Sequence, residues 1–219
     1  MDAARLRIKP IIRLLRKHYP GVRTALGYAN PLQILVATIL AAQSTDKLVN
    51  TVTPGLFRKY PTVEAFARAD RAALEQEIHS TGFFRNKTKA IIGAARRIVE
   101  AYGGVVPDSM EELVTLPGVA RKTANIVLSA GYGKAEGIAV DTHAGRLSRR
   151  LGLSRQDDPV KVERDLMALV PKADWIDFNF LLVEHGRAIC QARKPECPRC
   201  FLRRLCPSAT KFHPELKAP

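Results

Sequence analysis

Apolar residues recur along this chain at the spacing of helices, and alternating strand-like patterns are scarce. The segment Pro31–Gln43 (PLQILVATILAAQ) is almost continuously apolar, which predicts a buried central helix with Pro31 in its first turn. Breaks at Pro61 and Asp70 then separate shorter predicted helices over residues 46–59, 63–69 and 71–79. The pattern predicts an all-α fold.

Two further segments are amphipathic. The segment 87–102 places Ile91, Ala94, Ala95 and Ile98 on one face, and Gly103 and Gly104 are expected to end it. Near the N-terminus, Leu6, Ile11, Leu14 and Leu15 fall close to helical spacing among basic residues. We expect a first amphipathic helix there that belongs to the fold and is not a targeting segment.

Turn signals mark two other points. Ser109 and Glu112 are three residues apart, as in a capping box, and predict the start of a short helix. Gly131, Gly133 and Gly137 predict a loop near the middle of the chain, where one lobe could give way to another.

The charge of the chain narrows the class of partner. Among its 219 residues, 35 Lys and Arg stand against 21 Asp and Glu, a formal net charge of +14. A basic excess of this size indicates a polyanionic partner, most commonly nucleic acid. No apolar run reaches the 18 residues that a membrane-spanning helix needs, and nothing resembles a secretory leader, so we expect a cytoplasmic protein with no membrane partner.

The segment 111–133 (EELVTLPGVARKTANIVLSAGYG) predicts two helices joined by a tight turn at Pro117-Gly118-Val119, with the second helix opening at Ala120. Leu116 and Val119 would anchor the turn to the core. Such a turn presents the N–H groups of the second helix's first turn to solvent, and these groups together with the helix dipole form an anion site. Gly118 lets a phosphate approach the backbone, and Arg121 adds positive charge. An ordinary connection between two helices would carry the same Pro-Gly turn.

The residues around this hairpin follow a specific order. Lys122 lies in the first turn of the second helix, and Asp141 follows 19 residues later in the segment VDTHAGR. The order of hairpin, lysine, Gly-containing loop and aspartate resembles the helix-hairpin-helix DNA glycosylase superfamily. Within that superfamily it is most similar to the endonuclease III family, along nearly the whole chain as far as Cys206.

The resemblance implies a bifunctional DNA glycosylase and AP lyase of base excision repair. Such an enzyme removes oxidised pyrimidines from double-stranded DNA and cleaves abasic sites by β-elimination through a lysine Schiff base. Lys122 would attack the sugar, and the helix N-terminus and Arg121 both disfavour a charged ammonium there. Asp141 would take up a proton or stabilise positive charge on the sugar, and it also suits the start of a helix as an N-cap.

The four cysteines, Cys190, Cys197, Cys200 and Cys206, lie within 17 residues with the spacing C-x6-C-x2-C-x5-C. Such local clustering indicates a metal site, either zinc or a cubane iron–sulfur cluster. The resemblance favours a 4Fe-4S cluster as cofactor, in a basic loop at 190–206 that would face the DNA backbone.

The resemblance also implies residues that fill the gap left by an extruded base. Gln43 matches the family's gap-filling glutamine, and Phe83 lies where an aliphatic wedge is more usual. A polar helix end and a core position remain the alternatives for these two residues. His143 would contact phosphate or cap a helix. Ala120 departs from the family, which usually carries a second hairpin glycine there.

The implied architecture has two lobes. Residues 26–134 would form a six-helix lobe with the hairpin, and residues 1–25 and 135–219 would form a lobe with the cluster loop. A monomer would bind DNA between them, with Lys122 and Asp141 coming from different lobes. The alternatives are an adenine-mismatch glycosylase, which lacks the lysine, and a non-catalytic DNA-binding module with a redox-active cluster, against which Lys122 and Asp141 argue.

Overall fold

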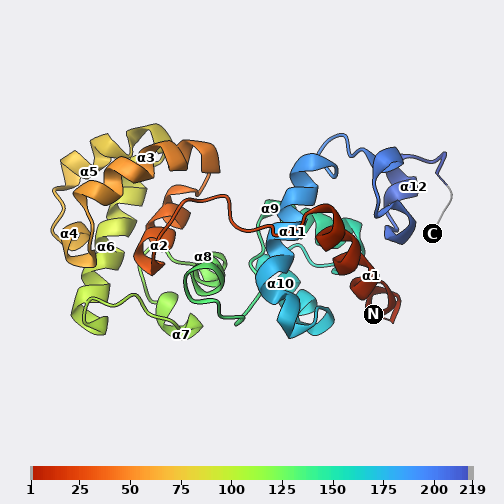
Figure 1. The fold of residues 1–219 in the computed structure, drawn as a ribbon, viewed down its shortest axis with the longest axis horizontal. Coiled ribbons are helices and arrows are strands. Elements are labelled where there is room, and N and C mark those ends of the chain that lie inside the picture. Colours follow the sequence, from red (N-terminus) through yellow and green to blue (C-terminus); the bar gives the residue numbers. More distant parts are fainter. Residues whose placement is uncertain (1, 217–219) are drawn as a thin grey trace. The chain divides into compact units, whose positions relative to one another are not determined.

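The computed structural model describes residues 2–216, and all regular secondary structure among them is helical (Figure 1), as the apolar spacing predicts. The α-helices are α1 (Asp2–His18), α2 (Pro31–Leu40), α3 (Asp46–Lys59), α4 (Val63–Ala67), α5 (Arg71–Glu77), α6 (Phe84–Tyr102), α7 (Met110–Leu113), α8 (Arg121–Ile126), α9 (Thr142–Arg150), α10 (Pro159–Leu169), α11 (Trp175–Ala188) and α12 (Ala209–Phe212). The shorter 3₁₀ or π segments are η1 (His79–Thr81), η2 (Val127–Gly131), η3 (Lys172–Asp174), η4 (Cys197–Arg199) and η5 (Arg203–Leu205).

Two compact units make up the described chain. One consists of Thr24–Glu136, and the other combines the residues up to Arg23 with those from Gly137 onward. We call them the middle unit and the terminal unit. Between residues 2 and 216, no helix combines the length and the apolar character that crossing a membrane requires.

Helix α2 is the centre of the middle unit. Its residues from Ile34 to Leu40 are all buried, and it packs against α3, α6, α8 and η2. The apolar run therefore buries every face of the helix, as the sequence predicts. Asn30 caps its N-terminus by accepting a hydrogen bond from the N–H of Gln33 at 3.0 Å, and Pro31 occupies the first turn.

The predicted helix ends differ from the observed ones at two loops of the middle unit. Helix α2 ends at Leu40, three residues before the apolar run does, because Gln43 adopts a left-handed backbone with φ of 54°. Helix α6 begins at Phe84, three residues earlier than predicted, and Phe83 precedes it with φ of 49°. Neither residue type signals a helix end, so the apolar pattern alone misplaces both boundaries.

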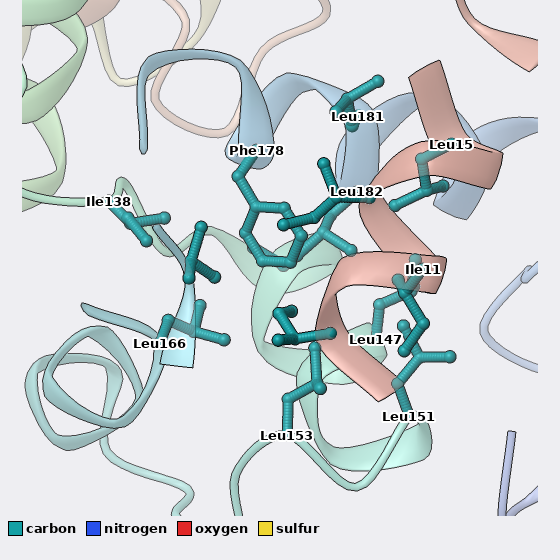
Figure 2. Packing of buried hydrophobic residues seen from close by; sticks show 14 of the residues in the cluster. Ile11, Leu15, Ile138, Leu147, Leu151, Leu153, Leu166, Phe178, Leu181 and Leu182 are labelled. Atoms are coloured by element: carbon teal, nitrogen blue, oxygen red, sulfur yellow. The ribbon is translucent and has the colours of Figure 1, made fainter. Parts of the chain in front are cut away.

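The terminal unit has its own apolar core, which joins α1 to α9, α10 and α11. Figure 2 shows the ring of Phe178 within this cluster and the side chains of Ile11 and Leu15 entering it from α1. The predicted amphipathic helix is present, but its inner face is not the one expected at every position. Leu6 is 80% exposed, whereas Ile8 is only 3% exposed and packs in the core. Leu6 was misassigned because it lies five residues before Ile11, and that spacing places it on another face of a 3.6-residue turn.

The turn between α7 and α8 packs tightly against α6. Gly118 has φ of 77°, and a Cβ at this position would lie 2.5 Å from the Cβ of Ala90. Gly93, one turn further along α6, has its missing Cβ 3.2 Å from two side-chain atoms of Pro117. Small residues on α6 thus let the hairpin turn approach that helix closely. Gly118 is required for both its backbone conformation and its lack of a side chain.

The two faces of α1 give a first prediction. Replacing Ile11, which is fully buried, by alanine should lower the free energy of unfolding by about 2–5 kcal/mol. Leu6→Ala on the same helix should change it by less than about 0.5 kcal/mol. Urea denaturation of both variants measures the difference. Equal losses would place Leu6 in the core after all.

The hairpin turn gives a second prediction, with Gly133 as the matched control. Gly133 has φ of 64° with no heavy atom within 4 Å of its missing Cβ, so Gly133→Ala carries only backbone strain of about 1–2 kcal/mol. Gly118→Ala carries similar strain plus the collision with Ala90, which adds about 1–3 kcal/mol. Thermal and urea unfolding compare the two variants. If Gly118→Ala is no more destabilised than Gly133→Ala, the turn does not depend on close packing.

Candidate nucleic-acid and catalytic site

The hairpin places its apolar residues inward and its turn outward. Leu116 and Val119 are 2% and 6% exposed and anchor the turn to the core, as the sequence predicts. Gly118 and Ala120 between and beyond them are exposed. The turn therefore presents backbone to solvent while its two anchors fix its position.

Ala120 is the N-cap of α8 and not its first helical residue as expected. Its backbone is extended, with φ of −93° and ψ of 169°, a conformation that alanine adopts without strain. Alanine has no side-chain oxygen, so the side chain of Ala120 accepts no hydrogen bond from the first N–H groups of α8. These N–H groups and the positive end of the helix dipole suit an anion, and η2 continues the helix to Gly131.

Lys122 is the second residue of α8 and is exposed, while its neighbour Arg121 is half-buried. The amine thus stands at the start of the hairpin's second helix, directly after the turn. A primary amine in this position is accessible to a ligand held by the turn. It belongs to the middle unit, whereas Asp141 belongs to the terminal unit.

Asp141 is half-buried and caps α9: its Oδ1 accepts a hydrogen bond from the N–H of Ala144 at 2.7 Å. The N-cap reading is therefore confirmed. This bond fixes the rotamer of the carboxylate through one oxygen and leaves Oδ2 outside the cap. A carboxylate held in this way can stabilise positive charge or accept a proton.

His143 does not cap α9, because Asp141 does. Its Nδ1 lies 3.1 Å from Nη2 of Arg146, and it packs against Gly186, whose missing Cβ would lie 2.6 Å from that nitrogen. Arginine can only donate, so Nδ1 accepts and the ring proton is on Nε2. Burial lowers the pKa of His143, with Arg146 and Arg187 acting in the same direction against Asp141. The ring is thus a neutral donor at neutral pH.

The four cysteine thiols of the terminal unit are free and line one cavity. Residues of α9 and α11 form its other walls, including Leu147 and His185, and Leu202 closes it from the cysteine loop. Arg150 ties this loop to α9: its guanidinium donates to the carbonyl of Gln191 at 2.7 Å and to Sγ of Cys190 at 3.3 Å. Among residues 2–216, no set of three or more His, Cys, Asp or Glu side chains surrounds a single metal-ion position.

Burial raises the pKa of the Cys200 thiol to about 12 and also raises the pKa values of Cys197 and Cys206. Thiols with pKa values raised in this way, as those of Cys197, Cys200 and Cys206 are, need a bound cation to stabilise their thiolates. Four sulfur donors with apolar walls fit the donor set of an iron–sulfur cluster.

Gln43 and Phe83, the two candidates for filling a gap in DNA, share an unusual backbone. Among residues 2–216 they are the two non-glycine residues with positive φ. Both are exposed, and Phe83 retains 60% of its accessible surface, so it is not the core residue that one alternative required. A non-glycine residue in this conformation costs about 1–3 kcal/mol and persists only where its surroundings enforce it.

Lys87 lies outside the motifs that indicate functional residues in the sequence. This lysine is 4% exposed, and its Nζ donates to the carbonyl oxygens of Leu40 at 2.7 Å and Thr81 at 2.8 Å. The sequence does indicate that Lys87 faces the core, because it lies four residues before Ile91 and therefore on the apolar face of α6. A charged residue on that face had to be buried or to distort the helix.

Comparisons with known proteins identify the family of the chain. The family model described as "HhH-GPD superfamily base excision DNA repair protein" matches residues 36–172. Endonuclease III of Synechocystis sp. is 56% identical to the chain over 209 residues, which is 95% of each sequence. Endonuclease III of Bacillus subtilis is 45% identical over 194 residues, 88% of each.

Solved structures give the same result. A trapped endonuclease III–DNA covalent intermediate matches with a TM-score of 0.90 at 40% identity, covering 94% of this chain and 97% of that one. A thermostable thymine-DNA glycosylase matches with a TM-score of 0.85 at 25% identity, covering 96% and 98%. The chain therefore belongs to the helix-hairpin-helix superfamily of base excision DNA repair proteins and, within it, to the endonuclease III family.

Proposed function

We propose that this protein is a bifunctional DNA glycosylase and AP lyase of base excision repair, which removes oxidised pyrimidines and cleaves abasic sites. One observation carries the proposal: the exposed amine of Lys122 stands directly after the hairpin turn, in a chain that matches a trapped endonuclease III–DNA covalent intermediate over 94% of its length. A covalent intermediate requires a nucleophile, and Lys122 supplies one.

The hairpin binds duplex DNA through its phosphates. The exposed backbone at Gly118 and Ala120 and the first N–H groups of α8 accept a phosphate, and Arg121 adds charge. Such contacts are independent of sequence, which suits a protein that must scan DNA for damage. In the terminal unit, the Nε2–H of His143 can donate to a further phosphate oxygen.

The chemistry runs through Lys122 and Asp141. The amine of Lys122 attacks C1′, the bond from C1′ to the base breaks, and the base leaves with the bonding electrons. Loss of the amine proton and opening of the sugar ring give a Schiff base. Removal of a C2′ proton then breaks the C3′–O bond and releases the 3′ phosphate. Asp141, held by its N-cap bond, stabilises positive charge on the sugar and accepts a proton.

Gln43 and Phe83 fill the gap that the extruded base leaves in the duplex. Their exposure and their enforced backbone conformations support this role. Phe83 offers an aromatic face that can stack on neighbouring bases.

Cys190, Cys197, Cys200 and Cys206 would hold a 4Fe-4S cluster, which supplies a covalent tie for a loop with little core of its own. The chain's own residues also hold the loop, because Arg150 donates a hydrogen bond to the carbonyl of Gln191 and apolar side chains line the cavity. The loop then keeps Arg193, Lys194 and Arg199 in place for phosphate. Residues 26–134 and the two terminal segments act as the two lobes of this enzyme.

Replacing the nucleophile tests the proposed function. Lys122→Gln should reduce strand nicking at abasic sites and borohydride cross-linking to abasic DNA by several orders of magnitude, because it removes the attacking amine. Duplex affinity should fall only slightly, since the hairpin backbone is unchanged. Lys9→Gln makes the same change at an exposed lysine of α1 and should behave as the parent. Normal cross-linking by Lys122→Gln would refute the assignment.

Metal analysis tests the cluster. The purified protein should be brown and contain about four irons per chain. Cys200→Ser removes one of the four sulfur ligands and should lower the iron content and the thermal stability. One equivalent of zinc in colourless, active protein would show that the loop holds a different metal.

A further inference from the structure

The side chain of Lys87 links the two loops that carry Gln43 and Phe83. Its Nζ donates to the carbonyl of Leu40, the last residue of α2, at 2.7 Å. It also donates to the carbonyl of Thr81, which lies two residues before Phe83, at 2.8 Å. The first carbonyl belongs to a helix end that has no intrahelical donor for it. One ammonium therefore satisfies backbone groups on both loops at once.

The surroundings of this ammonium show that the link is built and not incidental. Lys87 is 4% exposed and Thr81 is 2% exposed, so water competes little for either carbonyl. Burial lowers the pKa of Lys87, which means that the charged form is held against a desolvation cost. A buried methionine or leucine at this position would carry no such cost. The fold therefore uses the hydrogen-bond donors of the Lys87 ammonium, which an apolar side chain could not supply.

The backbone of Lys87 acts on the same region. Its N–H donates to the carbonyl of Phe83 at 3.1 Å, and the N–H of Asn86 donates to that carbonyl at 3.0 Å. On the other loop, the N–H of Ala42 donates to Ile39 and that of Ser44 to Ala41. These local bonds shape each loop separately. Only the Lys87 side chain among these contacts joins the two loops.

We propose that Lys87 is a positioning residue that couples the Gln43 loop to the Phe83 loop, so that both side chains enter the duplex as one unit when a base is extruded. The inference rests on the proposed function, in which Gln43 and Phe83 fill the vacated space. Two independently mobile loops would each have to be ordered during extrusion. Two loops that are already held together by one ammonium group lose less conformational entropy when they are ordered.

Lys87→Met tests the coupling, because methionine keeps an unbranched apolar side chain, one atom shorter than that of lysine, and donates no hydrogen bond. Single-turnover base release from duplex with an oxidised pyrimidine, at saturating enzyme, should fall about ten- to a hundredfold. Nicking of a preformed abasic site in single-stranded DNA needs no gap filling and should fall far less. Lys89→Met removes the same charge from an exposed position of α6 and should release base at the parental rate.

A double-mutant cycle separates positioning from general stabilisation. In the background Gln43→Ala with Phe83→Ala, Lys87→Met should change base release by less than about twofold, because the side chains through which it acts are gone. The same loss in both backgrounds would overturn the proposal. Should Lys87→Met fail to fold, Lys87→Gln replaces it, since a shorter neutral amide cannot reach both carbonyls.

Hydrogen exchange tests the coupling without any catalysis. In the Lys87 variant, the amides of residues 42–44 and of residues 82–83 should exchange faster by similar factors, while those of α4 should not change. Faster exchange in one loop only would refute the coupling. If the parent protein released no base but both loops loosened together, the proposed function would fail and the coupling would stand.

Discussion

Helix ends leave backbone N–H and C=O groups without intrahelical partners, and in this protein the ends carry the residues of interest. At α9, Asp141 satisfies the N-terminus with its own carboxylate. At α2, the buried carbonyl of Leu40 takes its donor from Lys87 on another helix. At α8, Ala120 supplies no cap from its side chain, and the N–H groups face the exposed turn. The first two arrangements hold elements of the fold together, and the third leaves N–H groups that suit an external anion.

Such a site is useful only if its position is fixed, and close packing fixes it. Leu116 and Val119 bury themselves on either side of the turn, and Gly118 comes so near to Ala90 that no side chain fits between them. The glycine was expected to let phosphate approach. It also lets the turn approach α6, and this second role is set by the protein alone. In the proposed function, phosphate binding and close packing would therefore depend on the same residue.

The terminal unit solves a different problem. Its core joins α1, α9, α10 and α11, and the cysteine loop contributes Leu202 to it and packs Phe201 and Leu205 against it. Arg150 and His185 hold that loop through hydrogen bonds to carbonyls and sulfur. Burial raises the pKa values of Cys197, Cys200 and Cys206, so thiolates at these positions need a nearby cation. A bound cluster would supply that cation and tie the loop together.

The sequence by itself determined the helical class, the buried α2, the hairpin with its two anchors, the cap at Asp141 and the family, because these depend on local spacing and on motifs a few residues long. Only the tertiary structure decided where α2 and α6 stop, since the left-handed backbones at Gln43 and Phe83 are enforced by their surroundings and are not favoured by the residues themselves. It also decided that Leu6 faces solvent and that Lys87 is buried. Lys87 is 47 residues from Leu40 and 6 residues from Thr81, the two residues whose carbonyls its ammonium binds. No local sequence pattern predicts that one side chain binds both.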